Sequence, residues 1–498
     1  MGANLADLVT ESAARTPGAP AIICADRTTS WSELEHLVRA VAGGLRERGL
    51  ERGARVGILL SNSLEFVTSY FGVLRAGLVA VPINSGYTPF EVTYHLEQSG
   101  AELLIADAST VTTAREAAGS VPIITVGTED WRRLMVGKTP PPLLDTDPEE
   151  LAVLMFTSGT SGRPKGAMLS HRALGANLDQ TTALDNPPAL LPEDVLLLIL
   201  PLFHVYALNG GLGLLAKVGA TAVLTDRFDP QLTLDMVRKY HVSVVATAPP
   251  VYQAWLEVDG LADRLAGVRL LVSGAAPLSE QVLGAFTEAA GKPVWEGYGM
   301  TEASPVITST LVTGEPRPGS VGAPLPGVEL KLVDEGGGEV DEGDPGEVVI
   351  RGANLFSGYW PDGDDGPDDQ GWWATSDVGI LDQLGELRLV DRRNDLIIVS
   401  GFNVYPREVE EIIARLPGVA EVAVMGTEHP YTGETVKALV VASEDVTSDA
   451  VIEFCQTRLA RFKCPTVVEF VATLPHSGTG KISKGALRDV ARQVRQTP

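Results

Sequence analysis

The order of apolar and polar positions predicts alternating helices and strands in the first part of the chain. Apolar residues recur at helical spacing from Leu34 to Leu45, just after Ser30 and Glu33, which have the spacing of a capping box. Short apolar runs predict strands at 56–60, 78–83 and 101–106, with helices at 63–76 and 88–98 between them. Such alternation is typical of parallel β-α-β units whose sheet is covered on both faces.

The pattern changes after residue 319. Glycines, prolines and short alternating runs, such as 328–333 and 347–351, predict a small antiparallel β-subdomain. Farther along, Pro406 opens a predicted helix with Glu408 in its first turn. The remaining predicted elements are strands at 419–425, 435–441 and 466–471 and a helix at 449–459. The last part of the chain therefore forms a unit of about a hundred residues, which is an ordinary domain size.

The composition is that of an ordinary globular protein. The chain has 498 residues, of which 44% are hydrophobic and 21% charged, so it can bury a large core without staples. Its three cysteines lack metal-ligand or disulfide spacing, which fits a reducing cytosol. The net charge of −25 disfavours nucleic acids and anionic membranes as partners. Pro201, His204 and several glycines interrupt the most apolar stretch, at 195–224, so we expect no integral membrane segment and a cytoplasmic location.

Residues 156–166 read Phe-Thr-Ser-Gly-Thr-Ser-Gly-Arg-Pro-Lys-Gly and suit a polyphosphate. Glycine lets backbone N–H groups approach an anion, the hydroxyls add donors, and Arg163 and Lys165 add charge. The run is not a Walker A loop, because Gly166 follows Lys165 instead of preceding it. A strand at 151–156 precedes the loop and a helix from about Ser170 follows it. We therefore expect a helix N-terminus beside the loop.

This run resembles the phosphate loop of the adenylate-forming superfamily, which holds acyl-CoA synthetases, adenylation domains and firefly luciferase. Further signatures follow in that family's order: Tyr298-Gly299-Met300-Thr301-Glu302, Asp377, Arg392, Gly401-Phe402 and Gly480-Lys481. The resemblance spans nearly the whole chain and is closest to fatty-acyl-CoA and hydroxycinnamate–CoA ligases.

The resemblance implies an α/β fold in two domains. The first, at 1–393, is a large N-terminal core of parallel-rich sheets flanked by helices, and it includes the β-subdomain at about 319–390. The second, at 394–498, is a small mobile α+β lid that pivots at Asn394. The family typically carries Lys or Asp at this hinge and Gly at Ser376, so this chain departs from the pattern at both positions.

The resemblance also implies the roles of the site residues. Lys481, Glu302 and Thr157 are the implied catalytic residues, with Lys481 bridging the carboxylate and the α-phosphate and Glu302 holding Mg²⁺. The implied ATP-binding residues are Thr157, Ser158, Gly159, Thr160, Ser161, Gly162, Lys165, Gly274, Ala275, Ala276, Tyr298, Gly299, Met300, Thr301, Asp377 and Arg392. The implied acyl pocket and gate residues are His204, Val205 and Gly297. Gly401 and Phe402 are the implied contacts of CoA.

Together these residues predict an ATP-dependent acid–CoA ligase. The expected reaction forms acyl-AMP and then acyl-CoA, releases pyrophosphate and AMP, and uses ATP, Mg²⁺ and CoA. A medium- or long-chain fatty acid is the first choice of substrate, which places the enzyme in lipid metabolism. Malonyl-CoA synthetases place Arg immediately before the motif tyrosine; here Gly297 argues against a dicarboxylate. An aryl acid is the alternative substrate, and a carrier-protein thiol is the alternative acceptor. A homodimer is left open.

A hypothesis from a different functional class is that the chain is an NAD(P)-dependent dehydrogenase. Gly211, Gly213 and Ala216 match a loose dinucleotide-binding pattern, with an acidic residue, Asp229, about twenty residues on. The match is weak, because the fingerprint should follow a strand directly. A non-enzymatic nucleotide-binding protein is disfavoured by the joint presence of Lys481 and Glu302.

Overall fold

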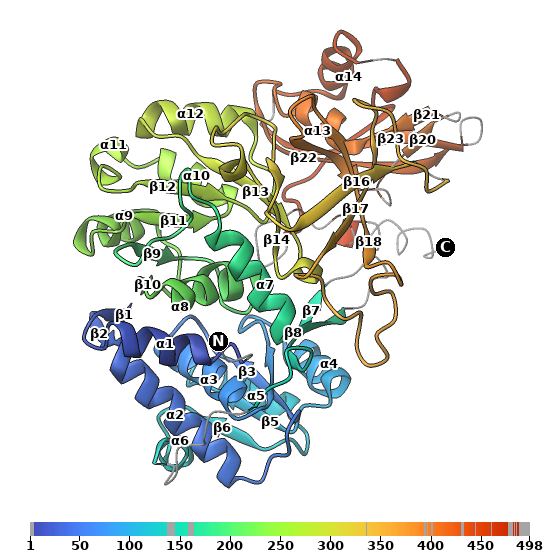
Figure 1. The fold of residues 1–498 in the computed structure, drawn as a ribbon. Coiled ribbons are helices and arrows are strands. Elements are labelled where there is room, and N and C mark those ends of the chain that lie inside the picture. The colour runs from blue at the N-terminus through green and yellow to red at the C-terminus, as the bar shows by residue number, and fades with distance from the viewer. Residues whose placement is uncertain are drawn as a thin grey trace. The chain divides into compact units, whose positions relative to one another are not determined.

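The computed structural model of the chain describes residues 4–136, 145–157, 164–334, 336–392, 395, 397–399, 402–429, 433–443, 445–459, 461–476, 482, 484 and 486–487. Its contacts divide the chain into two units. Figure 1 labels their helices and strands and colours them by position along the chain. The first unit holds Met1–Gly159, Arg163–Glu329 and Arg351–Trp373, and the second holds Thr160–Gly162, Leu330–Ile350 and Ala374–Pro498. The fold class is α/β, as predicted.

One sheet of the first unit has the strand order β6-β5-β3-β4-β7-β8. These strands are β3 (Arg55–Leu59), β4 (Val79–Pro82), β5 (Leu103–Ala106), β6 (Ile123–Thr125), β7 (Leu151–Thr157) and β8 (Lys165–Ser170). All neighbours pair in parallel except β7 and β8, which are antiparallel. The early helices are α1 (Asp7–Arg15), α2 (Trp31–Glu47), α3 (Leu64–Arg75), α4 (Pro89–Ser99), α5 (Val111–Ala117) and α6 (Glu129–Met135). The predicted β-α-β units of the first hundred residues are therefore confirmed.

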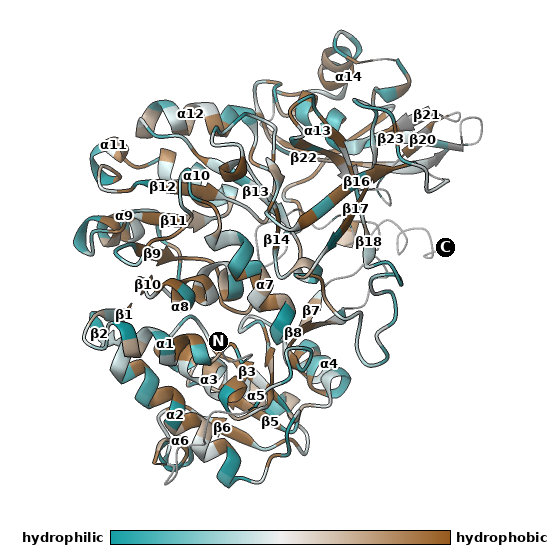
Figure 2. Cartoon of the chain, in the orientation of Figure 1, coloured by the Kyte–Doolittle hydropathy of each residue, from teal (hydrophilic) through white to brown (hydrophobic). Residues whose placement is uncertain are grey.

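Helix α2 shows why these segments fold as they do. Ser30 accepts a hydrogen bond from the backbone of Glu33, whose carboxylate accepts one from the backbone of Ser30, so the predicted capping box is present. Its apolar residues, such as Leu34, Val38 and Val41, are fully buried. Figure 2 shows hydrophobic and hydrophilic patches alternating along α2, as expected of a helix with one face on the core.

The second sheet of the first unit has the order β15-β14-β13-β12-β11-β9-β10-β1-β2. Its strands are β1 (Pro20–Cys24), β2 (Arg27–Ser30), β9 (Val195–Leu198), β10 (Thr221–Leu224), β11 (Val244–Thr247), β12 (Leu270–Ser273), β13 (Trp295–Gly299), β14 (Val306–Ser309) and β15 (Ala323–Pro324). Its helices are α7 (His171–Thr182), the π-helix η1 (Tyr206–Gly213), α8 (Leu214–Val218), α9 (Pro230–Lys239), α10 (Pro249–Leu256), α11 (Leu261–Arg264) and α12 (Glu280–Ala290), with short 3₁₀ turns η2 (Thr301–Ala303) and η3 (Thr310–Val312). A large apolar core joins strands β9 to β12 to helices α9 to α12.

A four-stranded sheet has the order β16 (Val328–Val333), β17 (Gly346–Gly352), β18 (Trp372–Leu381) and β19 (Leu387–Arg392). Most of it belongs to the second unit, but residues 328–329, 351–352 and 372–373 at the strand ends belong to the first. A further sheet has the order β21-β20-β23-β22, with β24 on β23. Its strands are β20 (Ile397–Val399), β21 (Phe402–Val404), β22 (Val419–His429), β23 (Gly433–Ala442) and β24 (Val467–Phe470), with helices α13 (Pro406–Ile413) and α14 (Ser448–Gln456) and the 3₁₀ turn η5 (Arg461–Lys463). Cys455 is buried among apolar residues, as its position in the helical pattern indicates.

One expectation about the phosphate loop is wrong. The helix predicted from about Ser170 exists as α7, but strand β8 lies between the loop and this helix. The loop therefore joins two antiparallel strands and does not open a helix. Four of the six residues of β8, Gly166, Ala167, Leu169 and Ser170, are buried, so most of this strand is covered by the core.

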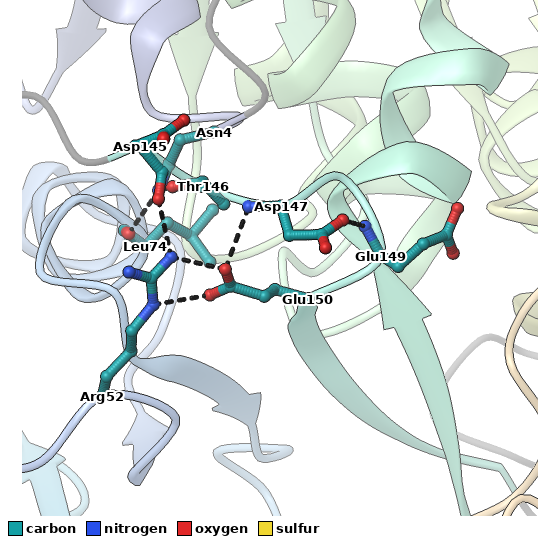
Figure 3. Close-up of polar contacts among 8 residues, drawn as sticks. All are labelled: Asn4, Arg52, Leu74, Asp145, Thr146, Asp147, Glu149 and Glu150. Carbon is teal, nitrogen blue, oxygen red and sulfur yellow. Dashed lines mark hydrogen bonds and ion pairs between the residues drawn. The ribbon is translucent and has the colours of Figure 1, made fainter.

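The segment that leads into β7 is fixed by Arg52 (Figure 3). The Arg52 guanidinium donates to both carboxylate oxygens of Glu150 and to the backbone carbonyl of Asp145. Glu150 in turn accepts a hydrogen bond from the backbone N–H of Asp147, at 2.9 Å. These contacts anchor the entry to the strand that carries the loop.

Of the helices in the described ranges, none has the length and apolar character needed to cross a membrane.

Candidate active site

The phosphate loop is bracketed by two residues that pair across the sheet. Thr157 ends β7, Lys165 begins β8, and the two are Cα partners in the antiparallel ladder. Ser158, Gly159, Thr160, Ser161, Gly162 and Arg163 lie outside the described residues. The structure therefore fixes where the predicted loop starts and ends.

Glu302 lies in the short turn η2 and points at the end of β7. Only 6% of its surface is exposed. Its Oε1 accepts a hydrogen bond from the Tyr359 hydroxyl at 2.7 Å and a long one from the Thr157 hydroxyl at 3.5 Å. The structure thus brings two predicted catalytic residues, Thr157 and Glu302, into contact. A backbone hydrogen bond adds a further tie, since Phe356 N–H donates to the Glu302 carbonyl at 2.9 Å.

Tyr359 completes this cluster and was missed by the sequence reasoning. Burial raises the pKa of its hydroxyl far above the usual value, and the adjacent Glu302 carboxylate raises that pKa further. Tyr359 therefore stays protonated and donates to Glu302. Nothing in the local sequence separates it from a packed core aromatic, because the contact joins residues 57 positions apart.

The Lys165 ammonium lies over the Tyr359 ring. Its Nζ is 5.1 Å from the ring centroid and forms an ion pair with Asp365 at 2.8 Å. A pocket of about 330 Å³ opens beside this pair, and its lining residues are Lys165, Tyr359, Trp360, Pro361, Asp362, Asp364 and Asp365. Asp365 is a second residue that the sequence analysis missed, since the acidic run around it has the composition of a solvated loop.

The motif at 298–302 is held by close backbone packing. Tyr298, in β13, is 8% exposed, and its hydroxyl is 4.0 Å from the Met300 sulfur. A Cβ on Gly299 would lie 2.2 Å from the carbonyl oxygen of Pro305, so glycine is required there. Thr301 belongs to η2, and Gly297 pairs with Ser309 across β13 and β14.

The segment at 273–276 lies at the carboxyl end of strand β12. Gly274 N–H donates to the Thr247 carbonyl at 3.0 Å, and a Cβ on Gly274 would touch the Tyr206 ring at 3.0 Å. Ala275 adopts a positive φ of 68°, which is uncommon outside glycine, and Ala276 follows it. The carboxyl ends of parallel strands are where α/β sheets bind ligands.

Two of the predicted pocket and gate residues, His204 and Val205, lie directly before the π-helix η1. The His204 ring is 5.1 Å from that of Phe203, and Val205 is buried. Next to them, the Tyr206 hydroxyl is buried without a hydrogen-bond partner among the described residues, and burial raises its pKa. The gate segment therefore lies beside Gly274, one of the predicted nucleotide contacts.

The dehydrogenase hypothesis is wrong, because the glycines of the proposed dinucleotide-binding pattern lie within the π-helix η1. Gly211 and Gly213 lie inside the helical stretch Tyr206–Gly213, which α8 continues. The fingerprint needs a tight turn between a strand and a helix, and this segment has none.

The remaining predicted residues belong to the second unit. Asp377 in β18 and Arg392 in β19 are Cα partners, and Asp377 N–H donates to the Thr375 hydroxyl at 3.1 Å. Ser376, just before Asp377, has a φ of +62°, a conformation that favours glycine. Phe402 begins β21 and pairs with Val399. Asn394, Gly401 and Lys481 lie outside the described residues.

Comparison with known proteins assigns the family. The model of the AMP-binding enzyme family matches residues 9–360, and that of its C-terminal domain matches residues 408–481. The long-chain-fatty-acid–CoA ligase of Escherichia coli O157:H7 is 32% identical, over 98% of this chain and 95% of that protein. The 4-coumarate–CoA ligase 3 of Oryza sativa subsp. japonica is 33% identical, over 92% of this chain and 86% of that protein.

Solved structures agree with this assignment. ATP-bound MatB from Rhodopseudomonas palustris superposes with a TM-score of 0.92 at 32% identity, covering 100% of both chains. The anthranilate CoA ligase AuaEII, solved with anthranoyl-AMP, has a TM-score of 0.89 at 28% identity and covers 99% of this chain and 98% of its own. With the phosphate-loop strands, the Thr157–Glu302 contact and these matches in place, the chain belongs to the AMP-binding enzyme family.

Proposed function

We propose that this protein is an ATP-dependent acid–CoA ligase. A carboxylate does not react with a thiol at neutral pH, because its leaving group would be oxide. In the first step the substrate carboxylate attacks the α-phosphorus of ATP, the bond to the β-phosphate breaks, and acyl-AMP and pyrophosphate form. In the second step the CoA thiolate attacks the acyl carbonyl and AMP leaves, giving the thioester. This chain is similar to proteins named as CoA ligases of fatty acids and of aryl acids, and this similarity supports the proposed reaction.

The observation that carries the proposal is the meeting of Thr157, Tyr359 and Glu302 at the end of β7. Thr157 offers a hydroxyl donor where the phosphate loop begins, and Lys165 offers a cation where it ends. Groups of this kind, fixed before the substrate arrives, stabilise the charge that develops on the phosphates during transfer. The proposed nucleotide contacts also include Gly274, Ala275, Ala276 and the residues of the 298–301 motif.

Glu302 fits a proposed magnesium site. Its nearly buried carboxylate has the hard oxygen ligands that Mg²⁺ prefers, and the Thr157 hydroxyl lies beside it. Within the described residues no cluster of three or more acidic, histidine or cysteine side chains exists that could hold a metal ion. A single protein carboxylate is nonetheless suitable, because Mg²⁺ at phosphate sites takes its other ligands from water and the substrate. When bound, the ion would neutralise charge on the triphosphate.

The second unit supplies the proposed lid. We propose that Asp377 accepts hydrogen bonds from the ribose with Arg392 beside it, and that Lys481 contacts both reacting partners. We also propose that residues 394–498 rotate about Asn394 between the two steps, bringing Gly401 and Phe402 to CoA. We also propose that the protein acts in the cytoplasm. Its oligomeric state is either a monomer or a homodimer.

A medium- or long-chain fatty acid is the proposed substrate, with entry near His204 and Val205. The apolar, buried Val205 and the absence of a cationic side chain at Gly297 support an apolar monocarboxylate. An aryl acid is the second candidate, favoured by similarity to the 4-coumarate and anthranilate ligases. Acyl transfer to a carrier-protein thiol is the alternative for the acceptor.

A panel of acids tests this function. Short, medium and long aliphatic acids and aromatic acids are each incubated with ATP and Mg²⁺, and AMP release is measured with and without CoA. The proposal expects AMP and a stoichiometric acyl-CoA only when acid and CoA are both present. AMP release that does not depend on CoA, in multiple turnovers, would indicate another acceptor.

A further inference from the structure

The pocket beside the phosphate loop contains more negative than positive charge. Among its described lining residues, Lys165 is the one cation, whereas Asp362, Asp364 and Asp365 are carboxylates. A nucleotide triphosphate is itself strongly anionic. The three carboxylates of the pocket are therefore not required for binding the proposed nucleotide.

Asp365 is the carboxylate that uses this cation. Its Oδ2 is 2.8 Å from Lys165 Nζ, at the distance of a charge-assisted hydrogen bond. The Tyr359 ring covers another side of the same ammonium. One hydrogen-bonding direction of the Lys165 ammonium is therefore occupied by an anion before any phosphate binds.

The backbone holds Asp365 in this position. Its φ is +56°, in the left-handed region that aspartate tolerates better than most residues. Its carbonyl accepts a hydrogen bond from the Trp373 indole N–H at 2.9 Å, and the Trp373 ring packs 5.1 Å from that of Phe356. The carboxylate is thus presented by a fixed loop conformation.

We propose that Asp365 is an internal competitor for the nucleotide phosphates at Lys165. Its carboxylate has the charge sign and the acceptor oxygens of a phosphate, and it leaves Lys165 when ATP binds. The Lys165 and Asp365 side chains are 42% and 66% exposed, so the exchange needs no change in the core. The inference rests on the proposed function, in which Lys165 binds ATP.

The competition weakens ATP binding by a modest factor. Exposed ion pairs contribute little free energy, so releasing Lys165 is expected to tighten binding by about two- to five-fold. Salt screens such pairs, so the gain shrinks as ionic strength rises.

The test is calorimetric titration of a non-hydrolysable ATP analogue with Mg²⁺. Asp365→Asn removes the charge and keeps a residue that tolerates positive φ. Asp364→Asn is the matched control, because it removes the same charge from the same pocket without touching the ion pair. Asp365→Asn is expected to bind the analogue more tightly than both Asp364→Asn and the wild type. In a Lys165→Met background the Asp365→Asn gain disappears.

Equal affinities of Asp365→Asn and Asp364→Asn would overturn the inference and leave the proposed function intact, since only general electrostatics would then act. A gain that persists in the Lys165→Met background would overturn it as well. If the wild type binds no analogue at all, the proposed function fails and this inference fails with it.

Discussion

Thr157 and Lys165 face each other across the β7–β8 ladder, so the phosphate loop begins and ends at neighbouring points of one sheet. Paired residues of antiparallel strands lie about 5 Å apart. A hydroxyl donor and a cation are therefore placed together by backbone hydrogen bonds. Glu302 contacts Thr157, and Tyr359 contacts both Glu302, through its hydroxyl, and Lys165, through its ring.

Replacement of Glu302 by glutamine should strongly impair adenylate formation. The glutamine side chain keeps an oxygen that can accept from Tyr359 but loses the charge proposed to hold Mg²⁺. Acid-dependent AMP formation is expected to fall by about 10²- to 10³-fold, the loss seen when a charge-stabilising group is removed. Tyr359→Phe removes one hydrogen bond to this carboxylate but keeps its charge, and is expected to cost about 10- to 100-fold. Equal losses in the two variants would contradict a charge-based role of Glu302.

Gly299→Ala tests the packing of the 298–302 motif. The new Cβ would lie 2.2 Å from the Pro305 carbonyl oxygen, so the backbone must shift and both stability and AMP formation should fall. We expect a loss of about 1–3 kcal/mol of unfolding free energy, measured by denaturant titration. Gly284→Ala in α12 is the matched control, because its Cβ meets no atom within 4 Å. It should instead stabilise the protein by about 0.5–1 kcal/mol.

Ser376→Gly should stabilise the second unit. Ser376 has a φ of +62°, where a side chain costs about 1–2 kcal/mol and glycine costs nothing. The more flexible unfolded chain of the Gly variant offsets part of this gain, which leaves about 0.5–1 kcal/mol. Thermal unfolding of Ser376→Gly and Ser376→Ala provides the measurement, since alanine keeps the strain. A Gly variant no more stable than the Ala variant would argue against strain at this position.

His171 should make stability depend on pH between 6.5 and 4. Burial lowers its pKa from 6.5 to about 4, and its Nδ1 accepts a hydrogen bond from Leu5 N–H, which requires the neutral ring. The unfolded state therefore binds a proton at higher pH than the folded state does. The stabilisation is fully present above pH 6.5 and is lost as the pH falls towards 4, by about 3 kcal/mol for a shift of this size.

His171→Asn is the variant that isolates this effect. Asparagine offers an oxygen to Leu5 N–H but does not titrate, so the slope of unfolding free energy against pH should become shallower in this range. Denaturant titrations at several pH values measure both slopes. Identical slopes would show that other groups cause the acid sensitivity.

The sequence predicted best those features that depend on neighbouring residues. The capping box at Ser30, the strands 56–60 and 328–333 and the helix after Pro406 follow from local pattern, and the structure confirms them. Strand β8 was missed because six residues between a glycine-rich loop and a helix carry too little periodicity to separate a strand from a helix start. Its pairing with β7 is a feature of the tertiary structure.

The site shows the same division. Glu302, Thr157 and Lys165 were found because they lie in motifs that resemble a known family. Tyr359 and Asp365 lie in a segment without such a motif, and their contacts with Glu302 and Lys165 join parts of the chain that are distant in sequence. Only the folded chain shows these contacts.

The most direct test of the account is acid-dependent exchange of labelled pyrophosphate into ATP, measured for the wild type and for Lys481→Ala. The account predicts exchange in the wild type only when a suitable carboxylic acid is present, and none in the variant, which should still convert supplied acyl-AMP and CoA to the thioester. Exchange that is unchanged in the variant would remove Lys481 from the first step. A wild-type protein that never cleaves ATP between its α and β phosphorus atoms, whichever acid is offered, would contradict the central claim.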